Sequence, residues 1–118
     1  MELKTKSFNT ITGTGGEDKA TKYLCNLGYK ILCRNFKTKI GEIDIIAKDK
    51  NTIVFVEVKT RKSDMFGLPR EAVTASKQHK IRMVATQYLK LHGGLNQMCR
   101  FDVIDILQGQ ISHIQNCF

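Results

Sequence analysis

Apolar and polar residues alternate through the centre of the chain with the period of two that is typical of β-strands. Two such segments, residues 41–47 and 53–59, are rich in isoleucine and valine, which favour strands. Between them, the four polar residues 48–51 predict a turn. We therefore expect two neighbouring strands that form an antiparallel hairpin at the centre of the fold.

Helical spacing of apolar residues is found on both sides of this hairpin. A first helix is expected between Thr14 and Gly28, where four apolar residues recur every three or four positions: Ala20, Tyr23, Leu24 and Leu27. A second helix is expected over about residues 71–91, with an apolar stripe made of six residues: Val73, Ile81, Val84, Ala85, Tyr88 and Leu89.

Shorter patterns complete the predicted order of elements. Residues 29–34 and 101–107 predict a first and a last strand, and residues 110–114 predict a short edge strand. Residues 36–40 are interpreted as a basic loop, and residues 61–70, which contain the only proline, as a mobile loop. The order α-β-β-β-α-β predicts an α/β fold in which helices flank a mixed central sheet.

The length of 118 residues suits one domain with its own hydrophobic core. We expect a single domain over residues 1–118, with its core at 14–107 and a flexible polar segment at 1–13. No apolar run approaches the roughly 20 residues of a membrane span, and the N-terminus lacks the apolar stretch of a signal peptide. A cytoplasmic protein without membrane association is expected.

The chain is basic and contains four scattered cysteines. Its formal net charge is +8, from 19 Lys and Arg residues against 11 Asp and Glu residues. This surplus favours a polyanionic partner; the alternative is a solvated basic surface. The cysteines have neither CxxC nor zinc-finger spacing, so we expect no disulfides, and Cys25 and Cys33 are expected to be small core residues.

Three charged residues stand on the two central strands. Glu57 and Lys59 are two positions apart and point to one face of their strand. Asp44 lies on the neighbouring strand, where an antiparallel hairpin brings it near Phe55 or Glu57. A buried charge is costly unless it is paired or binds a metal. The alternatives are therefore a salt-bridge cluster on an exposed sheet face and a metal site.

Hard oxygen ligands of this kind suit Mg²⁺, or Mn²⁺ in its place. Asp44 and Glu57 could supply two ligands, and the main-chain carbonyl of Val58 could supply a third. Lys59 could position or deprotonate an attacking water, or stabilise charge on a phosphate; the sequence does not choose between these roles. The pattern Asp…Glu-x-Lys thus predicts a magnesium-dependent nuclease.

Six ordered motifs carry a family resemblance: Gly16-Glu17-x-x-Ala20, Arg34-Asn35, Gly41-Glu42-Ile43-Asp44, Phe55-Val56-Glu57-Val58-Lys59-Thr60-Arg61, Phe66-Gly67-x-Pro69 and Arg100-Phe101-Asp102. The chain resembles the YraN-like family (UPF0102), a largely uncharacterised bacterial group. That family is similar to archaeal Holliday-junction resolvases and to the PD-(D/E)xK restriction-endonuclease-like superfamily. The resemblance covers about residues 14–107.

The resemblance implies an α-β-β-β-α-β core with a metal site formed by Asp44, Glu57 and Lys59. It also implies that Glu17, on the first helix, faces this site as a further acidic catalytic residue. The alternative is that Glu17, in the first helical turn, serves only the helix dipole. One departure from the superfamily pattern is that Ile43, rather than proline, precedes Asp44.

Other polar residues are candidates for nucleic-acid contacts. Arg61 and Lys62 follow the Glu57 strand, and Lys77 and Gln78 stand on the second helix. Each could contact a phosphate, and each could instead be an ordinary solvated side chain.

Five further residues are expected to have no role in the site. The three histidines have no partner at ligand spacing, and two aspartates are expected to end or border the last strand: His79, His92, His113, Asp102 and Asp105.

The leading hypothesis is a Mg²⁺-dependent endonuclease that acts on DNA, including branched or structured DNA. The alternatives are a non-catalytic nucleic-acid-binding module and a partner subunit with a nuclease-like fold. A homodimer is compatible with cutting two strands, and the choice between DNA and RNA is left open by the sequence.

Overall fold

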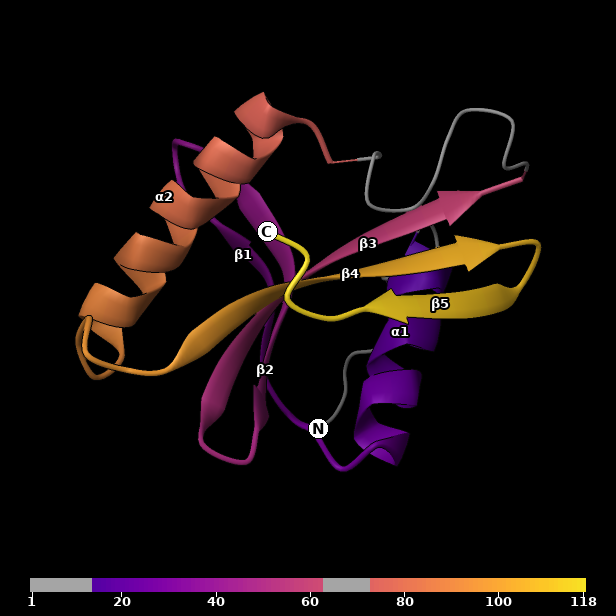
Figure 1. The fold of residues 1–118 in the computed structure, drawn as a ribbon, viewed down its shortest axis with the longest axis horizontal. Coiled ribbons are helices and arrows are strands. Elements are labelled where there is room, and N and C mark those ends of the chain that lie inside the picture. The colour runs from indigo at the N-terminus through magenta and orange to yellow at the C-terminus, as the bar shows by residue number, and fades with distance from the viewer. Residues whose placement is uncertain (1–13, 63–72) are drawn as a thin grey trace.

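The computed structural model describes residues 14–62 and 73–118, which form one five-stranded mixed sheet with two packed helices (Figure 1). The elements follow the chain in this order: α1 (Thr14–Asn26), β1 (Lys30–Lys37), β2 (Glu42–Asp49), β3 (Thr52–Arg61), α2 (Ala75–Leu91), β4 (Cys99–Leu107) and β5 (Gln110–Ile114). The predicted α-β-β-β-α-β order is confirmed, with β5 added at the edge.

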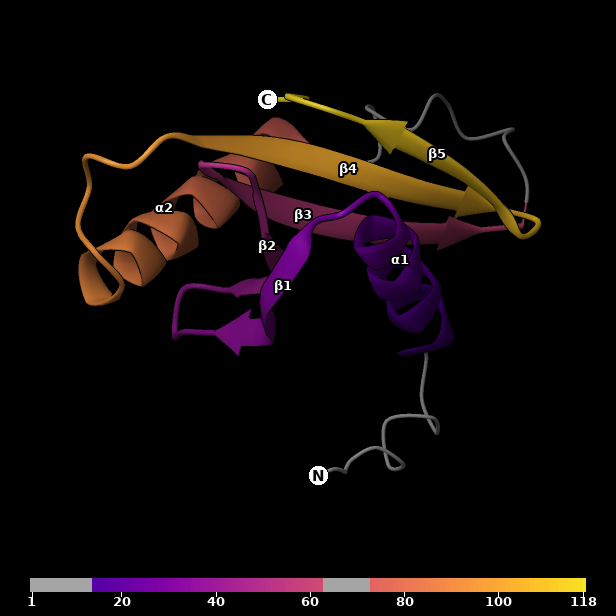
Figure 2. The same ribbon diagram turned by 90° about the horizontal axis from the view of Figure 1, so that it is seen from below.

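The order of strands across the sheet is the same as their order along the chain. β1, β2 and β3 form an antiparallel meander, α2 then connects β3 to a parallel β4, and β5 returns antiparallel to β4. Figure 2 shows the long β3–β4 pair with α2 near one end and α1 near the other, and the strong twist that turns the β1–β2 hairpin away from it.

Alternation along β3 separates two cores. Val54 and Val56 are fully buried in a cluster with Ala20 and Leu24 of α1. Phe55 points to the other face, where it lies in the cluster that α2 covers. Each helix therefore packs against its own face of the sheet, as the alternating valines predict.

The second helix starts later than predicted, and Val73 lies before it rather than in it. The helix begins at Ala75, with Thr74 as its N-cap accepting a hydrogen bond from the Lys77 amide at 3.2 Å. Val73, which was expected in the helical stripe, precedes the helix but is only 3% exposed and packs into the α2 core.

Several local expectations are wrong for identifiable reasons. The β2–β3 turn spans only Lys50 and Asn51, because β2 and β3 pair as far as Asp49 and Thr52. β1 extends to Lys37 and takes up the start of the predicted basic loop.

The end of α1 also differs from the prediction. Cys25 is exposed and Leu27 is 50% exposed, because the sheet covers only one side of this helix. Cys33 is partly buried against the α2 core, and all four cysteines are free. Gly28 has a φ of 92°, as its predicted helix-terminating position requires.

Asp102 and Asp105 do not border the last strand but lie inside β4, 0% and 1% exposed. Asp102 accepts hydrogen bonds from Arg100 at 3.0 Å and from the Asn116 amide at 2.9 Å. Asp105 is paired with Arg61 of the adjacent β3 at 2.7 Å. These partners come mainly from other segments of the chain, so the local pattern gives no sign that the carboxylates can be buried.

The predicted flexible segment 1–13, most of the predicted loop 61–70 and the expected helix start at 71–72 lie outside the described residues. Within the ranges that the structure describes, neither helix is long and apolar enough to cross a membrane.

The approach of α1 to β3 depends on a glycine. A Cβ atom at Gly16 would lie 2.3 Å from the Thr60 hydroxyl, whereas a Cβ at Gly15 would meet nothing within 4 Å. Gly16 thus lets the first turn of α1 pack directly on β3.

We expect Gly16→Val to lower the free energy of unfolding by about 1–3 kcal/mol, because the added atoms meet the Thr60 hydroxyl and either that side chain or α1 has to move. Gly15→Val is the matched control and should change stability by less than about 1 kcal/mol. Urea denaturation of both variants measures the difference. Equal losses of stability would contradict the proposed close approach at Gly16.

Candidate active site

The site is built where the β2–β3 ladder stops. The ladder ends with Ile45 opposite Val56, so Asp44 and Glu57 are the next residues in register. The strands separate at this point, and the Val58 amide donates to Asp44 Oδ2 at 2.8 Å instead of to a main-chain carbonyl. The side chain of Asp44 thereby replaces the missing ladder partner and is held beside Glu57.

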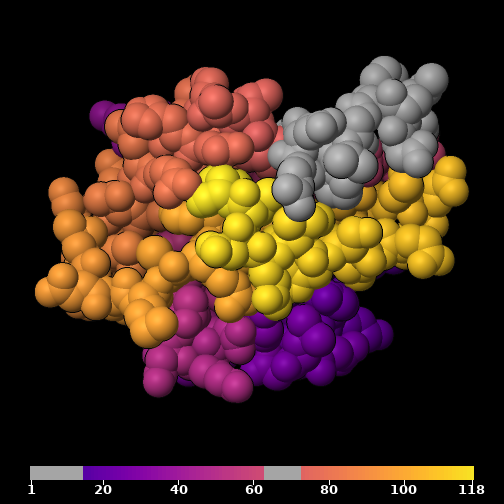
Figure 3. All heavy atoms as spheres, in the orientation of Figure 1, coloured from indigo at the N-terminus to yellow at the C-terminus, as the bar shows by residue number. Residues whose placement is uncertain are grey.

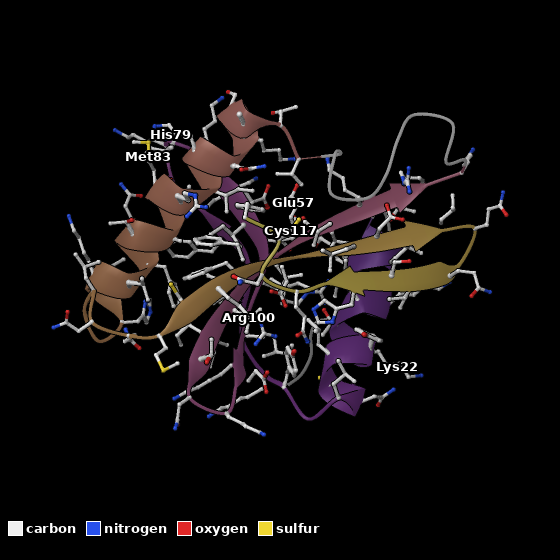
Figure 4. All side chains as sticks on the ribbon, in the orientation of Figure 1. Lys22, Glu57, His79, Met83, Arg100 and Cys117 are labelled. Atoms are coloured by element: carbon white, nitrogen blue, oxygen red, sulfur yellow. The ribbon has the colours of Figure 1, made fainter. Side chains whose placement is uncertain are left out.

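Glu57 is a buried carboxylate contacted by two lysines. Its side chain is only 6% exposed. Lys77 Nζ lies 2.6 Å from Glu57 Oε2, and Lys59 Nζ lies 3.9 Å from the same oxygen. Lys77 comes from the first turn of α2, and Figure 4 shows Glu57 between that helix and β3. Residues from three elements, β2, β3 and α2, therefore meet at one place.

Burial and like charge raise the pKa of Asp44 from 3.8 to about 7. Desolvation is the largest cause, and the negative charges of Glu57 and Glu17 add to it, while the Val58 amide opposes them. The Asp44 carboxyl is therefore poised between its neutral and charged forms near pH 7.

The pKa values of Lys59 and Lys77 are shifted in opposite directions. Burial and the neighbouring charge of Lys77 lower the pKa of Lys59. Burial alone would lower the pKa of Lys77 as well, but its hydrogen bond and charge interaction with Glu57 outweigh that effect and raise it. Lys77 thus serves as the counter-ion of Glu57, and Lys59 is the lysine that more readily gives up its proton.

The donor set fits a hard divalent cation. Within a strand, the N–H and C=O groups of one residue point to the same edge, so the Val58 carbonyl faces the gap that its amide faces. Across residues 14–62 and 73–118, no three His, Cys, Asp or Glu side chains gather as a cation cage. Mg²⁺ retains several waters and is commonly held by one or two carboxylates together with substrate phosphates. Asp44, Glu57 and the Val58 carbonyl are enough for such a site.

Glu17 lies at the margin of this group. Its Oε1 accepts a hydrogen bond from Asn35 Nδ2 at 2.9 Å, and the same amide nitrogen lies 3.2 Å from Glu42 Oε2. Arg34 is 3.8 Å from Glu17. The charge of Glu17 reaches Asp44, as the shifted pKa of Asp44 indicates. Asn35, for which the sequence suggested no role, therefore orients Glu17; its position in the Arg34-Asn35 motif was the available signal.

The four residues predicted to contact nucleic acid do not lie together in the structure, and their surroundings differ from one another. Arg61 donates to both oxygens of the buried Asp105, at 2.7 and 3.2 Å, and Gln78 donates to the Val73 carbonyl at 3.0 Å. Lys62 is exposed at the end of β3. Only Lys77 joins the carboxylates, and it does so through Glu57. The nucleic-acid roles of these four residues stay predictions.

Sequence comparisons with known proteins all indicate the same family, and the names of these relatives state no activity. The model of "Uncharacterised protein family UPF0102" matches residues 16–106. A UPF0102 protein of Caldicellulosiruptor saccharolyticus is 47% identical over 112 residues, covering 90% of this chain and 95% of that protein. A UPF0102 protein of Clostridium botulinum is 52% identical over 100 residues, covering 84% and 81%.

Among solved structures, the chain is similar to one titled "Structure of EndoMS-dsDNA2 complex", with 16% identity and a TM-score of 0.41. That likeness covers 86% of this chain and 40% of the other, and it is too weak to support a functional argument. The matching family model and the relatives of nearly equal length establish that this chain belongs to the uncharacterised protein family UPF0102.

Proposed function

We propose that this protein is a metal-dependent endonuclease that hydrolyses phosphodiester bonds in DNA, with Mg²⁺ or Mn²⁺ as its cofactor. The observation that carries the proposal is the pair Asp44 and Glu57, which lie opposite each other at the open end of the β2–β3 ladder. Lys59 lies two residues after Glu57 on β3 and points to the same face of that strand. Two carboxylates and a lysine in this arrangement suit hydrolysis at a phosphate better than a purely structural role.

Asp44, Glu57 and the Val58 carbonyl would hold the metal ion. When bound, Mg²⁺ supplies a Lewis acid for a phosphodiester oxygen and lowers the pKa of a bound water toward ~7. The raised pKa of Asp44 supports this assignment, because burial and the nearby charge of Glu57 both disfavour the Asp44 carboxylate, and a bound cation would stabilise it. Deprotonation of Asp44 and metal binding should therefore accompany each other.

Lys59 is the residue that would act on the attacking water or on the scissile phosphate. Its lowered pKa increases the neutral fraction, which can accept a proton from water. In its charged form, the same ammonium group can hold a phosphate oxygen. Lys77 keeps the Glu57 carboxylate in place through the 2.6 Å ion pair.

The basic charge of the chain would supply DNA affinity. A net charge of +8 favours a polyanion, and contacts from lysines such as Lys62 to phosphates would release counterions. Binding should therefore weaken steeply as salt rises, whether or not the DNA is cut.

The Lys77–Glu57 ion pair also favours a second candidate, a nucleic-acid-binding module without catalysis. Both lysines at Glu57 already neutralise its charge without a metal ion. In such a protein, Asp44 would serve only to cap the Val58 amide. The two candidates differ in whether divalent cations bind at Asp44 and whether DNA is cut.

A cleavage assay separates these candidates. Single-stranded, duplex, flap and four-way-junction DNA would be incubated with Mg²⁺, with Mn²⁺ or with EDTA, and an RNA strand would be included. We expect metal-dependent cutting that falls by about 100-fold or more in Glu57→Gln, because a metal ligand is weakened, while binding in EDTA is retained.

Asp18→Asn is the control for this assay, since Asp18 is a half-exposed carboxylate of α1 that pairs with Arg34. It should cut like the native protein. Salt-sensitive binding without metal-dependent cutting of any substrate would favour the binding module.

Asp44→Asn should stabilise the metal-free protein. The Asp44 carboxyl has a folded pKa of about 7 against 3.8 in a model peptide, so its burial costs stability as pH rises from 4 to 7, and the full cost persists above 7. Asparagine can still accept from the Val58 amide. We expect a gain of about 1–2 kcal/mol at pH 8 and little change at pH 4.

Thermal melting of both proteins with and without Mg²⁺ checks this prediction. Mg²⁺ should raise the melting temperature of the native protein at pH 8 and have a much smaller effect on Asp44→Asn. A variant that is less stable than the native protein at pH 8 would contradict the expected cost of burying the Asp44 carboxylate beside Glu57.

A further inference from the structure

A surface pocket of about 400 Å³ lies between α1 and the β4–β5 edge, apart from the carboxylate site. Its lining residues come from the outer side of α1, the β4–β5 turn and β5: Lys19, Lys22, Tyr23, Asn26, Gly109 and Ile111. Figure 4 shows Lys22 on α1, well away from Glu57, and Figure 3 shows α1 against the C-terminal strands. The pocket shares no residue with the Asp44–Glu57 group.

The mouth of the pocket is positively charged. Lys19 and Lys22 are both exposed, and among the described residues neither takes part in an ion pair. Gly109 has a φ of +82°, and a Cβ atom at that position would lie 3.6 Å from Lys19 Nζ. A larger residue there would fill the mouth beside this lysine. Two ammonium groups without partners at an open pocket favour an anionic ligand.

The wall of the pocket is rigid and mostly apolar. Tyr23 and Ile111 both pack against the buried α1 core. The Tyr23 hydroxyl is 3.2 Å from His113 Nδ1, and His113 Nε2 is 2.7 Å from Asp102 Oδ2. The His113 and Asp102 side chains are only 5% and 0% exposed, so the tyrosine is anchored on buried polar groups. A fixed aromatic ring is a suitable surface for a planar ligand group.

We propose that this pocket binds one unpaired nucleotide of a DNA strand. The base packs on Tyr23 and Ile111, and the adjoining phosphate contacts Lys19 and Lys22. The volume lies in the range of about 300–1,000 Å³ that is usual for ligand sites, and stacking plus phosphate contacts is the common mode of single-strand binding. The choice of DNA rests on the proposed nuclease function; the recognition of a nucleotide rests on the pocket alone.

α1 connects the pocket with the candidate active site. Glu17, at the margin of that site, and Tyr23 are six residues apart on one helix, which corresponds to about 9 Å along its axis. Six residues are also about 1.7 helical turns, so the two side chains leave α1 on different sides, and a strand that passes the carboxylates would have to continue around α1 to place an unpaired nucleotide in the pocket. The preferred substrate is then DNA with a single-stranded tail or branch rather than a blunt duplex.

Fluorescence anisotropy in EDTA tests this preference without catalysis. The labelled probes are a blunt duplex, the same duplex with an unpaired tail, and the single strand. We expect the native protein to bind the tailed duplex about tenfold more tightly than the blunt one. In Lys19→Gln/Lys22→Gln this preference should fall to about twofold or less, because the phosphate contacts of the tail are lost.

Lys48→Gln/Lys90→Gln is the matched control, since both lysines are exposed and the charge change is the same. It should weaken binding of all three probes by a similar factor and keep the preference for the tail. If the pocket variant behaves like this control, or if the native protein shows no preference, the pocket assignment is wrong.

A second readout does not depend on DNA cutting. Thymidine monophosphate, titrated into the isotopically labelled protein, should shift the amide signals of Lys22, Tyr23 and Ile111 and leave those of Glu57 and Val58 unchanged. Absence of shifts around the pocket would overturn the assignment. Nucleotide binding at the pocket with no metal-dependent cleavage would instead show that the proposed nuclease function fails while the pocket assignment holds.

Discussion

The hydrogen bond between the Val58 amide and Asp44 is the interaction on which the site depends. β2 and β3 pair along the hairpin up to Ile45 and Val56 and then separate. A buried main-chain amide without a partner would cost about 1–3 kcal/mol, so the gap is stable only because a side chain supplies the missing acceptor. That requirement places one carboxylate at the start of the gap, directly across from Glu57.

The same arrangement creates an electrostatic conflict. Asp44 is desolvated beside Glu57, and its pKa rises to about 7 in consequence. Lys77, on α2, neutralises the charge of Glu57, while Lys59 makes a longer contact with Glu57 at 3.9 Å. A protein selected only for stability would gain by removing one carboxylate. The presence of both carboxylates beside the Val58 edge of the gap is the physical reason for proposing chemistry at this place.

Much of this arrangement follows from local pattern. Strand alternation correctly placed Glu57 and Lys59 on the face opposite Val54 and Val56. The predicted hairpin put Asp44 near Phe55 or Glu57, and the observed register puts it next to Glu57. This part of the site could be predicted because a hairpin places residues that are close in sequence next to each other in space.

What could not be predicted depends on contacts between distant segments. Asp105 is buried because Arg61 reaches it from β3, and Asp102 is buried because His113 and Arg100 surround it. The ion pair of Lys77 with Glu57 requires the crossover through α2. Cys25 was predicted wrongly for a different reason, because it lies outside the apolar stripe of Ala20, Tyr23 and Leu24 on which α1 is buried.

The most direct test of the central claim is to locate a bound divalent cation by paramagnetic relaxation with Mn²⁺. Substoichiometric Mn²⁺, added to the labelled protein, should broaden the amide signals of Asp44, Glu57 and Val58 first, and excess Mg²⁺ should restore them. Broadening that is absent, or that is confined to residues away from the β2–β3 gap, would contradict a metal site formed by Asp44 and Glu57.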